Sequence, residues 1–323
     1  MMGQSCAGFA NGLGNWIIYT SILQCLASIS DNNQIDLILD DGWQTEARKA
    51  IQLMAENSPF IRKVVGYPSG YNARQYQHQY MSFHSIVQSR FFQFLHGEKI
   101  LERQNYVCWA DLWHEQEFYL QEIRTQLRYK GPVYEQYVPV IPFQRLVKGP
   151  YIVVANGYSK GNEGIWERKA YPHFAELLDA ILRYDKDLSV VFVGDEEDGR
   201  WAKNTRLFLD AYFNRTHNVC GKLSVLETIA VIKQAQFGIY NDGFAAHVAD
   251  ALKTPGVVLW GSTLISKNGG LNGTLINLRS PCLCAPCQGT SSFSECKNSS
   301  ICMSNIPVGW IMAAIRKNFL TIK

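Results

Sequence analysis

Short apolar runs recur through the second half of the chain, and each is ended by a polar residue or a glycine. They lie at 151–155, 189–193, 237–240 and 256–260. Their length and composition fit buried β-strands. Segments of helical periodicity lie between them, so strands and helices alternate. That alternation predicts a parallel sheet covered by helices on both faces.

The helical segments carry their own start signals. Pro172 precedes a helix whose apolar side chains recur on one face. Those side chains are Phe174, Leu177, Leu178, Ile181 and Leu182. Ser224 and Glu227 have the spacing of a capping box before the next helix. Residues 245–252 form a third helix, rich in small residues, that can pack close to the sheet.

The first half predicts a strand at 35–39, a helix at 43–57 and a strand at 61–67. Residues 71–98 have no clear period. Four prolines between 132 and 150 mark the connection to the second half. We therefore expect an α/β protein with two Rossmann-like doubly wound domains, 1–145 and 146–323, which face each other across a cleft. Ligands of such sheets bind beyond the carboxyl ends of the strands.

Composition narrows the class of protein. The 323 residues are 47% hydrophobic and 18% charged, as in soluble globular proteins. The net charge of +3 is scattered and does not indicate nucleic-acid binding. No apolar stretch reaches the length of about 20 residues that spans a membrane, which leaves at most a peripheral membrane contact. Residues 1–10 do not resemble a secretory signal, so we expect a cytoplasmic protein.

The turn after the strand at 237–240 is the first candidate site. Asp242 and Gly243 lie between that strand and a helix that carries His247. A helix start offers unpaired N–H groups to an anion, and Asp242 can accept hydrogen bonds from sugar hydroxyls. The alternative is that Asp242 only caps the helix and His247 is a core residue. Because Phe244 tolerates a positive φ poorly, we expect Gly243 to adopt the left-handed conformation.

Two further segments are candidates for anion binding. Gly12 and Gly14 lie in a glycine-rich turn that leads into a helix with apolar residues on one face. A turn without a ligand is the alternative. Lys169 precedes the helix that Pro172 opens, where a cation is unfavourable unless an anion lies between them. The alternative for Lys169 is a solvated surface lysine. After the strand at 189–193, Glu197 or Asp198 is placed to contact a ribose.

Five of the nine cysteines lie between 282 and 302. Cys284, Cys287, Cys296 and Cys302 have the pattern C-x2-C-x8-C-x5-C. Four thiolates can hold zinc or iron tetrahedrally. Unligated or disulfide-linked thiols are the alternative, and both remain open.

Together these motifs resemble those of the heptosyltransferase family, glycosyltransferase family 9, over Tyr151 to about Ile306. "KAYP" is similar to the family's Lys-x-Trp-Pro. The segment from "GKLSVLE" through "NDGFAAHVADAL" to "WGST" is similar to its Gly-Lys-x-Ser-x-x-Glu, Asp-Thr/Ser-Gly-x-x-His and Gly-Pro-Thr block. In the first half, "NGLGNWIIYTSIL" is similar to the Gly-x-Gly-Asp opening.

The resemblance implies a GT-B fold and inverting transfer of a sugar from a nucleotide-diphosphate sugar such as ADP-heptose. The acceptor would be a hydroxyl of a glycan, glycolipid or protein, as in lipopolysaccharide biosynthesis, and the chemistry would need no cofactor. Lys169 would hold the diphosphate, Glu197 or Asp198 the ribose, and Asp242 the transferred sugar. The Gly243–Phe244 backbone would contact the phosphates, and His247 would support the turn.

One departure concerns the base that the resemblance implies. Asn15 stands where the family has an Asp, and an amide cannot accept a proton near neutral pH. Asp111 and Asp41 are the other acids considered for the role. Two rivals therefore remain: an inactive sugar-nucleotide or glycan binding protein with this fold, and an assembly module organised by metal bound at the cysteines.

Overall fold

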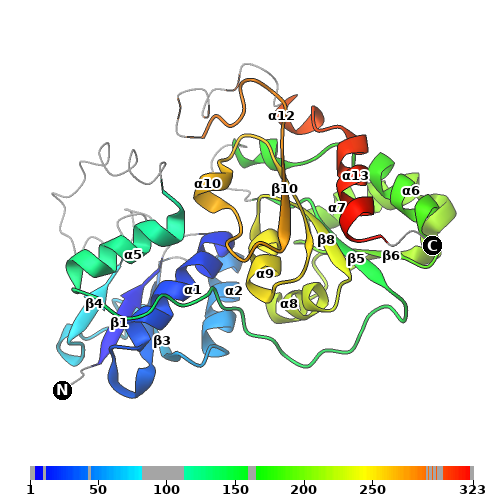
Figure 1. Ribbon diagram of the computed structural model, residues 1–323. Coiled ribbons are helices and arrows are strands. Elements are labelled where there is room, and N and C mark those ends of the chain that lie inside the picture. Colours follow the sequence, from blue (N-terminus) through cyan, green and yellow to red (C-terminus); the bar gives the residue numbers. More distant parts are fainter. Residues whose placement is uncertain are drawn as a thin grey trace. The chain divides into compact units, whose positions relative to one another are not determined.

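The computed structural model describes residues 4–9, 12–42, 45–81, 113–158, 165–288, 290, 293, 296 and 301–320. The chain divides into two compact units, Met1–Pro139 and Val140–Lys323. Each unit is built on a parallel sheet (Figure 1). The division falls within the proline-containing connection, six residues before the expected boundary after residue 145.

The first unit contains a four-stranded parallel sheet in the order β3-β2-β1-β4. Its elements are β1 (Ser5–Gly8), α1 (Leu13–Ala27), η1 (Asp31–Asn33), β2 (Ile35–Asp40), α2 (Glu46–Glu56), β3 (Ile61–Tyr67), η2 (Ala73–Gln75), β4 (His78–Tyr80) and α5 (Glu115–Gln126). The predicted strands at 35–39 and 61–67 are confirmed as β2 and β3. The helix predicted at 43–57 is α2, which begins after Thr45, whose hydroxyl accepts a hydrogen bond from the Arg48 amide.

Helix α1 is buried more completely than its one apolar face predicts. Every residue from Trp16 to Leu23 is buried. The reason is that α1 packs against β1 and β2 and also against α5, α2 and η1. A helix enclosed in this way has no solvent side along its middle, and its first residues, Gly12 to Asn15, are partly or fully exposed.

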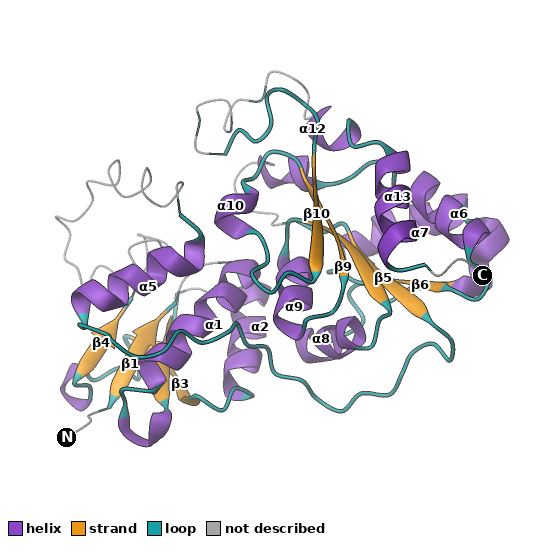
Figure 2. Ribbon diagram, viewed as in Figure 1, coloured by secondary structure: helices purple, strands orange, loops and turns teal. Residues whose placement is uncertain are grey.

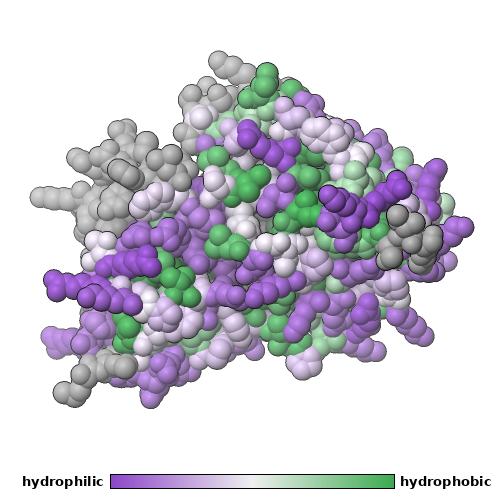
Figure 3. Space-filling view, in the orientation of Figure 1, coloured by the Kyte–Doolittle hydropathy of each residue, from purple (hydrophilic) through white to green (hydrophobic). Residues whose placement is uncertain are grey.

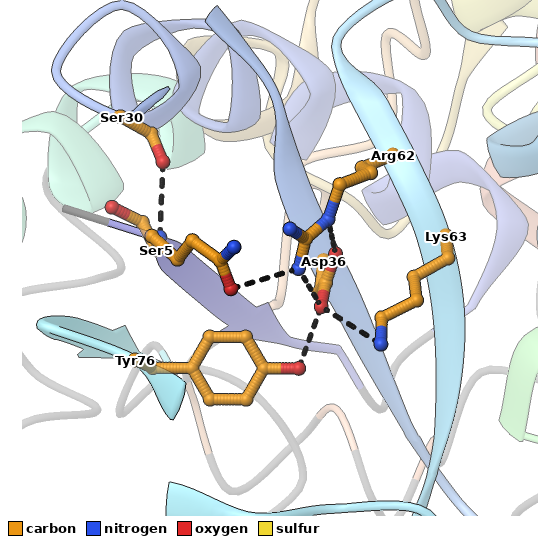
Figure 4. Close-up of polar contacts among 7 residues, drawn as sticks. Ser5, Ser30, Asp36, Arg62, Lys63 and Tyr76 are labelled. Carbon is orange, nitrogen blue, oxygen red and sulfur yellow. Dashed lines mark hydrogen bonds and ion pairs between the residues drawn. The ribbon is translucent and has the colours of Figure 1, made fainter. Parts of the chain in front are cut away.

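An ion pair lies inside the first unit at the amino end of β2 (Figure 4). Asp36 is fully buried, and the Arg62 guanidinium donates to its two carboxylate oxygens at 2.7 and 2.6 Å. The Tyr76 hydroxyl donates to the same carboxylate at 2.6 Å, and Lys63 Nζ lies 3.7 Å away. These contacts tie β2 to β3 and to the chain before β4.

The second unit contains a six-stranded parallel sheet in the order β10-β9-β8-β5-β6-β7. Its elements are β5 (Tyr151–Ala155), η4 (Ile165–Lys169), α6 (Phe174–Tyr184), β6 (Ser189–Phe192), α7 (Asp198–Phe208), η5 (Asp210–Arg215), β7 (Thr216–Asn218), α8 (Val225–Lys233), β8 (Phe237–Asn241), α9 (Phe244–Leu252), β9 (Gly256–Trp260), α10 (Ile265–Asn268), β10 (Leu275–Arg279), α12 (Ile301–Ser304) and α13 (Val308–Asn318). The alternation of strands and helices predicted for this half is confirmed.

The two faces of this sheet have different covers (Figure 2). Alternate residues of β5, β6, β8 and β9 pack into one core with α6, α7 and α13. On the other face, α8 packs against α9, and the Tyr151 hydroxyl donates to the Val231 carbonyl in α8 at 2.8 Å. With both faces covered, the ends of the strands are where polar groups can meet a ligand.

A buried aromatic ring packs against the backbone of β8 and β9. A Cβ on Gly238 would overlap the Tyr240 ring. A Cβ on Gly256 would lie 2.7 Å from the Gly238 carbonyl oxygen and 3.1 Å from Tyr240. Both positions therefore require glycine, because the ring occupies the space that their side chains would fill.

On the face shown in Figure 3, hydrophobic side chains form small groups among hydrophilic ones. None of the helices in the described parts of the chain has the length and apolar character that crossing a membrane requires.

Candidate functional site

An ion pair lies where β8 of the second unit ends. Lys169 Nζ is 2.7 Å from an Asp242 carboxylate oxygen. The Lys169 side chain is 14% exposed and that of Asp242 3%. His247 Nε2, one turn into α9, is 3.9 Å from the other carboxylate oxygen. The structure thus brings together three predicted residues from η4, the β8–α9 turn and α9.

The surroundings of Asp242 keep its carboxyl ionised. Burial by itself raises the pKa of Asp242. The charges of Lys169 and His247, with hydrogen bonds from Lys169 and Thr263, outweigh that effect and lower the pKa below its usual value. Asp242 is therefore a hydrogen-bond acceptor at neutral pH and not a general acid.

The turn between β8 and α9 is shaped by close backbone approach. Gly243 has φ −171° and ψ −174°, which is extended backbone. The expectation of a left-handed glycine is wrong, because the chain leaves β8 extended and enters α9 directly at Phe244. A Cβ on Gly243 would lie 3.3 Å from the Gly157 carbonyl oxygen, so the glycine serves a close contact. The first N–H groups of α9 face out of the helix beside Asp242.

A pocket of about 260 Å³ lies at the neighbouring strand ends. It is lined by Asn156, Tyr158, Ala170, Glu197, Asp198, Arg200 and Trp201. Asp198 accepts a hydrogen bond from the Asp195 amide at 3.1 Å, and its carboxylate fills the space beside Gly157 and Gly194. Asp198 thus forms part of the pocket's floor, whereas Glu197 is exposed at the start of α7.

Lys169 is positioned by two neighbours that its sequence context does not single out. Its ammonium lies 4.6 Å from the centre of the Trp166 ring, a cation–π contact. The Asn241 side-chain amide donates to the Lys169 carbonyl at 3.1 Å, which joins η4 to the end of β8. Trp166 also meets the ring of Phe293 edge-on at 5.4 Å, and Arg168 donates to the Phe293 carbonyl.

The thiols between 282 and 302 lie near one another. Cys282 Sγ and Cys284 Sγ are 3.2 Å apart. Burial and then the neighbouring thiols Cys296 and Cys284 raise the pKa of Cys287, and burial raises that of Cys302 to about 11. None of the cysteines in the described residues forms a disulfide. No three His, Cys, Asp or Glu side chains in the same residues are grouped to hold a metal ion. The four-thiol metal site stays a prediction.

In the first unit, Asn15 lies in the first turn of α1, after Gly12 and Gly14. Its side-chain amide donates to Glu115 Oε1. Glu115 is 1% exposed and also accepts a hydrogen bond from the Tyr119 hydroxyl at 2.5 Å. Asp111 lies outside the described residues.

Sequence reasoning missed Glu115, Trp166, Asn241 and Thr263 as neighbours of the candidate residues. Asn241 is next to Asp242 in the sequence, and Trp166 is three residues before Lys169. A polar or aromatic residue so close to a candidate residue could have indicated a neighbour in the site. Glu115 and Thr263 are distant in sequence from the residues that they contact. No pattern in the chain pairs them.

The sequence profile of glycosyltransferase family 9 (heptosyltransferase) matches residues 74–297, more than half of the chain. No curated protein matches the chain. Among solved structures, E. coli ADP-heptose lps heptosyltransferase II has a TM-score of 0.64 at 16% identity, with 85% of this chain and 90% of that chain covered. E. coli heptosyltransferase WaaC with ADP has a TM-score of 0.63 at 13% identity, with 98% and 99% covered.

A third structure of similar fold is the dodecameric iron-containing heptosyltransferase TibC of enterotoxigenic E. coli, in complex with ADP-D-β-D-heptose. Its TM-score is 0.59 at 12% identity, with 98% of this chain and 76% of that chain covered. These identities are low, so the structures establish the fold, and the sequence profile establishes the family. The chain belongs to glycosyltransferase family 9 and is a glycosyltransferase with two parallel-sheet α/β domains of the GT-B type.

Proposed function

We propose that this enzyme transfers a glycosyl group from a nucleotide-diphosphate sugar, with ADP-heptose as the first candidate, to a hydroxyl group, with inversion at the anomeric carbon. The acceptor belongs to a glycan, glycolipid or protein, and a lipopolysaccharide precursor is one such glycolipid. The observation that carries the proposal is the Lys169–Asp242 pair beside the start of α9. The solved structures of WaaC and TibC, which share the fold, hold ADP and ADP-D-β-D-heptose.

The charges at the β8–α9 turn suit a sugar joined to a diphosphate. The ammonium of Lys169 and the N–H groups at the start of α9 both attract anionic oxygens. Asp242 would repel a phosphate, but its ionised carboxylate accepts hydrogen bonds from sugar hydroxyls. One turn can therefore hold the diphosphate through Lys169 and Gly243 and the sugar through Asp242, while His247 supports Asp242.

The nucleoside end of the donor fits the pocket beside this turn. Its volume of about 260 Å³ lies next to Ala170, the neighbour of Lys169 in the chain. Asp198 already accepts a hydrogen bond within the protein, so we assign the ribose contact to Glu197. Gly157 joins the two regions, since its carbonyl approaches Gly243 and its Cα approaches Asp198.

In the transfer step, the acceptor oxygen forms a bond to the anomeric carbon as the bond from that carbon to the diphosphate oxygen breaks. The diphosphate leaves with the electron pair. Lys169 and the α9 dipole stabilise the charge that develops on it. The proton of the acceptor hydroxyl passes to a base, and no metal ion is needed for any of these changes.

Two finer expectations belong to this proposal. TibC is an iron-containing heptosyltransferase, and Cys284, Cys287, Cys296 and Cys302 are the residues that would hold a structural zinc or iron ion here. A cytoplasmic location fits the thiols, since none in the described residues is in a disulfide.

The test is calorimetric titration of the purified protein with ADP, UDP, GDP and their sugars. We expect ADP or ADP-heptose to bind and the affinity to fall in Lys169→Ala and Asp242→Ala. Lys186→Ala removes an exposed lysine of the same unit and is the control. The proposal is wrong if no nucleotide binds, or if both variants bind as tightly as the control.

Asn15 favours a second candidate, a protein that binds the donor without transferring the sugar. In that case ADP-heptose binds with wild-type affinity but releases no ADP, with or without added acceptors. Measurable release of ADP by the wild-type protein excludes this candidate.

A further inference from the structure

A buried carboxylate in the first unit contacts the residue that departs from the family pattern. Glu115 is the first residue of α5, and its side chain is enclosed between α5 and α1. Its Oε1 atom accepts a hydrogen bond from the Asn15 side-chain amide and another from the Tyr119 hydroxyl at 2.5 Å. The two helices pack against each other. The contact therefore joins the first turns of two packed helices.

The chemistry of this contact fixes which way the Asn15 side chain faces. The amide nitrogen of Asn15 is the donor in this contact, so it faces Glu115. The amide oxygen then faces away from Glu115, on the side of the Gly12 turn, where it lies 3.8 Å from the position of a Cβ on Gly12. Position 15 thus presents a hydrogen-bond acceptor of fixed direction beside the glycine-rich turn.

We propose that Glu115 is a positioning residue, which holds the Asn15 amide so that its oxygen accepts a hydrogen bond from the attacking hydroxyl. This rests on the proposed function and extends it by giving the glycine-rich turn, which is similar to the family's Gly-x-Gly-Asp opening, the role of receiving the acceptor. Asn15 orients the nucleophile and does not take its proton. The same contact accounts for the amide at this position, because an Asp would bring a second negative charge against a carboxylate that is 1% exposed.

The first experiment adds a carboxyl group at position 15 and then moves the single carboxyl group from position 115 to position 15, and it needs no substrate. In Asn15→Asp, two carboxyl groups share one contact and retain a proton between them, so their shared pKa is raised. A raised pKa in the folded state gives stability at low pH that is lost as the pH rises. We expect the Tm deficit of Asn15→Asp against wild type to grow from about pH 5 to about pH 8. The double variant Asn15→Asp/Glu115→Gln restores one amide and one carboxylate, and its deficit should not grow.

The second experiment measures release of ADP from ADP-heptose, with water as the acceptor. Glu115→Ala removes the group that orients Asn15, and we expect release to slow by about 10- to 100-fold. Glu115→Gln keeps an acceptor oxygen and should stay within about threefold of wild type. Tyr119→Phe removes a different hydrogen bond to Glu115 without touching Asn15, so it is the matched control for stability lost at this carboxylate.

The outcomes separate this inference from the proposed function. Either of two results overturns the role of Glu115. One is that Asn15→Asp has the same Tm as wild type at every pH, and the other is that Glu115→Ala releases ADP as fast as Tyr119→Phe does. ADP affinity of each variant is measured in parallel and should match wild type. Failure of the wild-type protein to bind ADP, UDP, GDP or any of their sugars refutes the proposed function instead, and the pH series still judges the contact. If Glu115→Ala does not fold, the pH series of Asn15→Asp and Asn15→Asp/Glu115→Gln decides.

Discussion

The two units each bury one aspartate against a basic side chain, and the two pairs are built differently. Asp36 lies at the amino end of β2, and a guanidinium and a phenol engage both of its oxygens. Asp242 lies just past the carboxyl end of β8, and the charged group nearest to it is the ammonium of Lys169, with His247 and Thr263 also beside it. Arg62 delivers two hydrogen bonds in a fixed plane, whereas Lys169 is a point charge on a flexible stem.

The difference indicates what each pair does. The Asp36 carboxylate is satisfied within the protein and joins two strands and a loop (Figure 4). The Lys169 ammonium can leave one partner for another at little cost in geometry, and it lies at the edge of a parallel sheet where ligands bind. We therefore expect changes at Asp36 to affect folding and changes at Lys169 to affect binding.

The largest effect is expected at the structural pair. Asp36→Asn removes the charge that Arg62 and Tyr76 contact, and we expect the free energy of unfolding to fall by about 3 kcal/mol. Arg62 is 35% exposed and can regain water, which keeps the loss at the lower end for buried pairs. Urea denaturation measures it. The affinity for ADP of the protein that remains folded should equal that of wild type; a tenfold weaker affinity would show that this pair also serves the donor.

At the binding pair, Lys169→Met should weaken ADP binding by about 10- to 100-fold, or about 1.4 to 2.7 kcal/mol. The methionine keeps the apolar contact with Trp166 and removes only the charge. Calorimetry gives the affinity and urea denaturation the stability. A stability loss as large as that of Asp36→Asn, with ADP binding unchanged, would reverse the comparison.

Exchanging arginine for lysine in one pair and lysine for arginine in the other tests whether hydrogen-bond geometry matters more at Asp36 than at Asp242. Arg62→Lys loses one of two parallel hydrogen bonds to Asp36 and should cost about 1 to 2 kcal/mol of unfolding free energy. Lys169→Arg keeps the charge and should leave stability within about 0.5 kcal/mol of wild type. Both are read from urea denaturation at one pH. Equal losses for the two exchanges would mean that geometry matters as much at Asp242 as at Asp36.

The Asp242 pair should also show in the pH dependence of stability. Because the pKa of Asp242 is lowered in the folded state, its ionised form adds stability above the pKa of the unfolded chain. That contribution disappears as the pH falls through the folded pKa. The difference between wild type and Asp242→Asn should thus be larger at pH 7 than at about pH 3. A difference independent of pH would show that the carboxylate gains nothing from Lys169.

The smallest effect is expected for Gly243→Ala. The extended φ of −171° suits alanine, and the methyl group would lie 3.3 Å from the Gly157 carbonyl oxygen. We expect stability to change by about 0.5 kcal/mol and ADP affinity to fall several-fold, because the methyl group narrows the approach to α9. Tm and calorimetry measure the two effects. A large loss of stability with unchanged affinity would assign Gly243 to folding alone.

Much of the second unit could be predicted from its sequence. The strands at 151–155, 237–240 and 256–260 consist mainly of β-branched and aromatic apolar residues, and buried parallel strands need apolar residues on both faces. The capping box of Ser224 and Glu227 is formed, since each side chain accepts from the other's backbone amide. Local signals suffice there because the partners are three residues apart.

The rest depends on contacts between distant residues. Helix α1 has no polar side along its middle because other elements enclose it, and periodicity alone does not report such enclosure. The Asn15–Glu115 contact joins residues 100 positions apart. Lys169 and Asp242 are predicted from the sequence as two separate site residues. Their direct ion pair depends on the position of η4 at the strand ends, and no pattern in the sequence specifies that position.

The ring of Tyr240 packs against the second sheet close to the acidic turn. It lies two residues before Asp242 and takes the room that Gly238 and Gly256 leave. Backbone hydrogen bonds set the spacing of β8 and β9, and the ring covers the face of the sheet that the two glycines leave open, just before the acidic turn. A designer who wishes to reshape this turn, for a donor of another size, should change the ring and its two glycines together, before any residue that would touch the sugar.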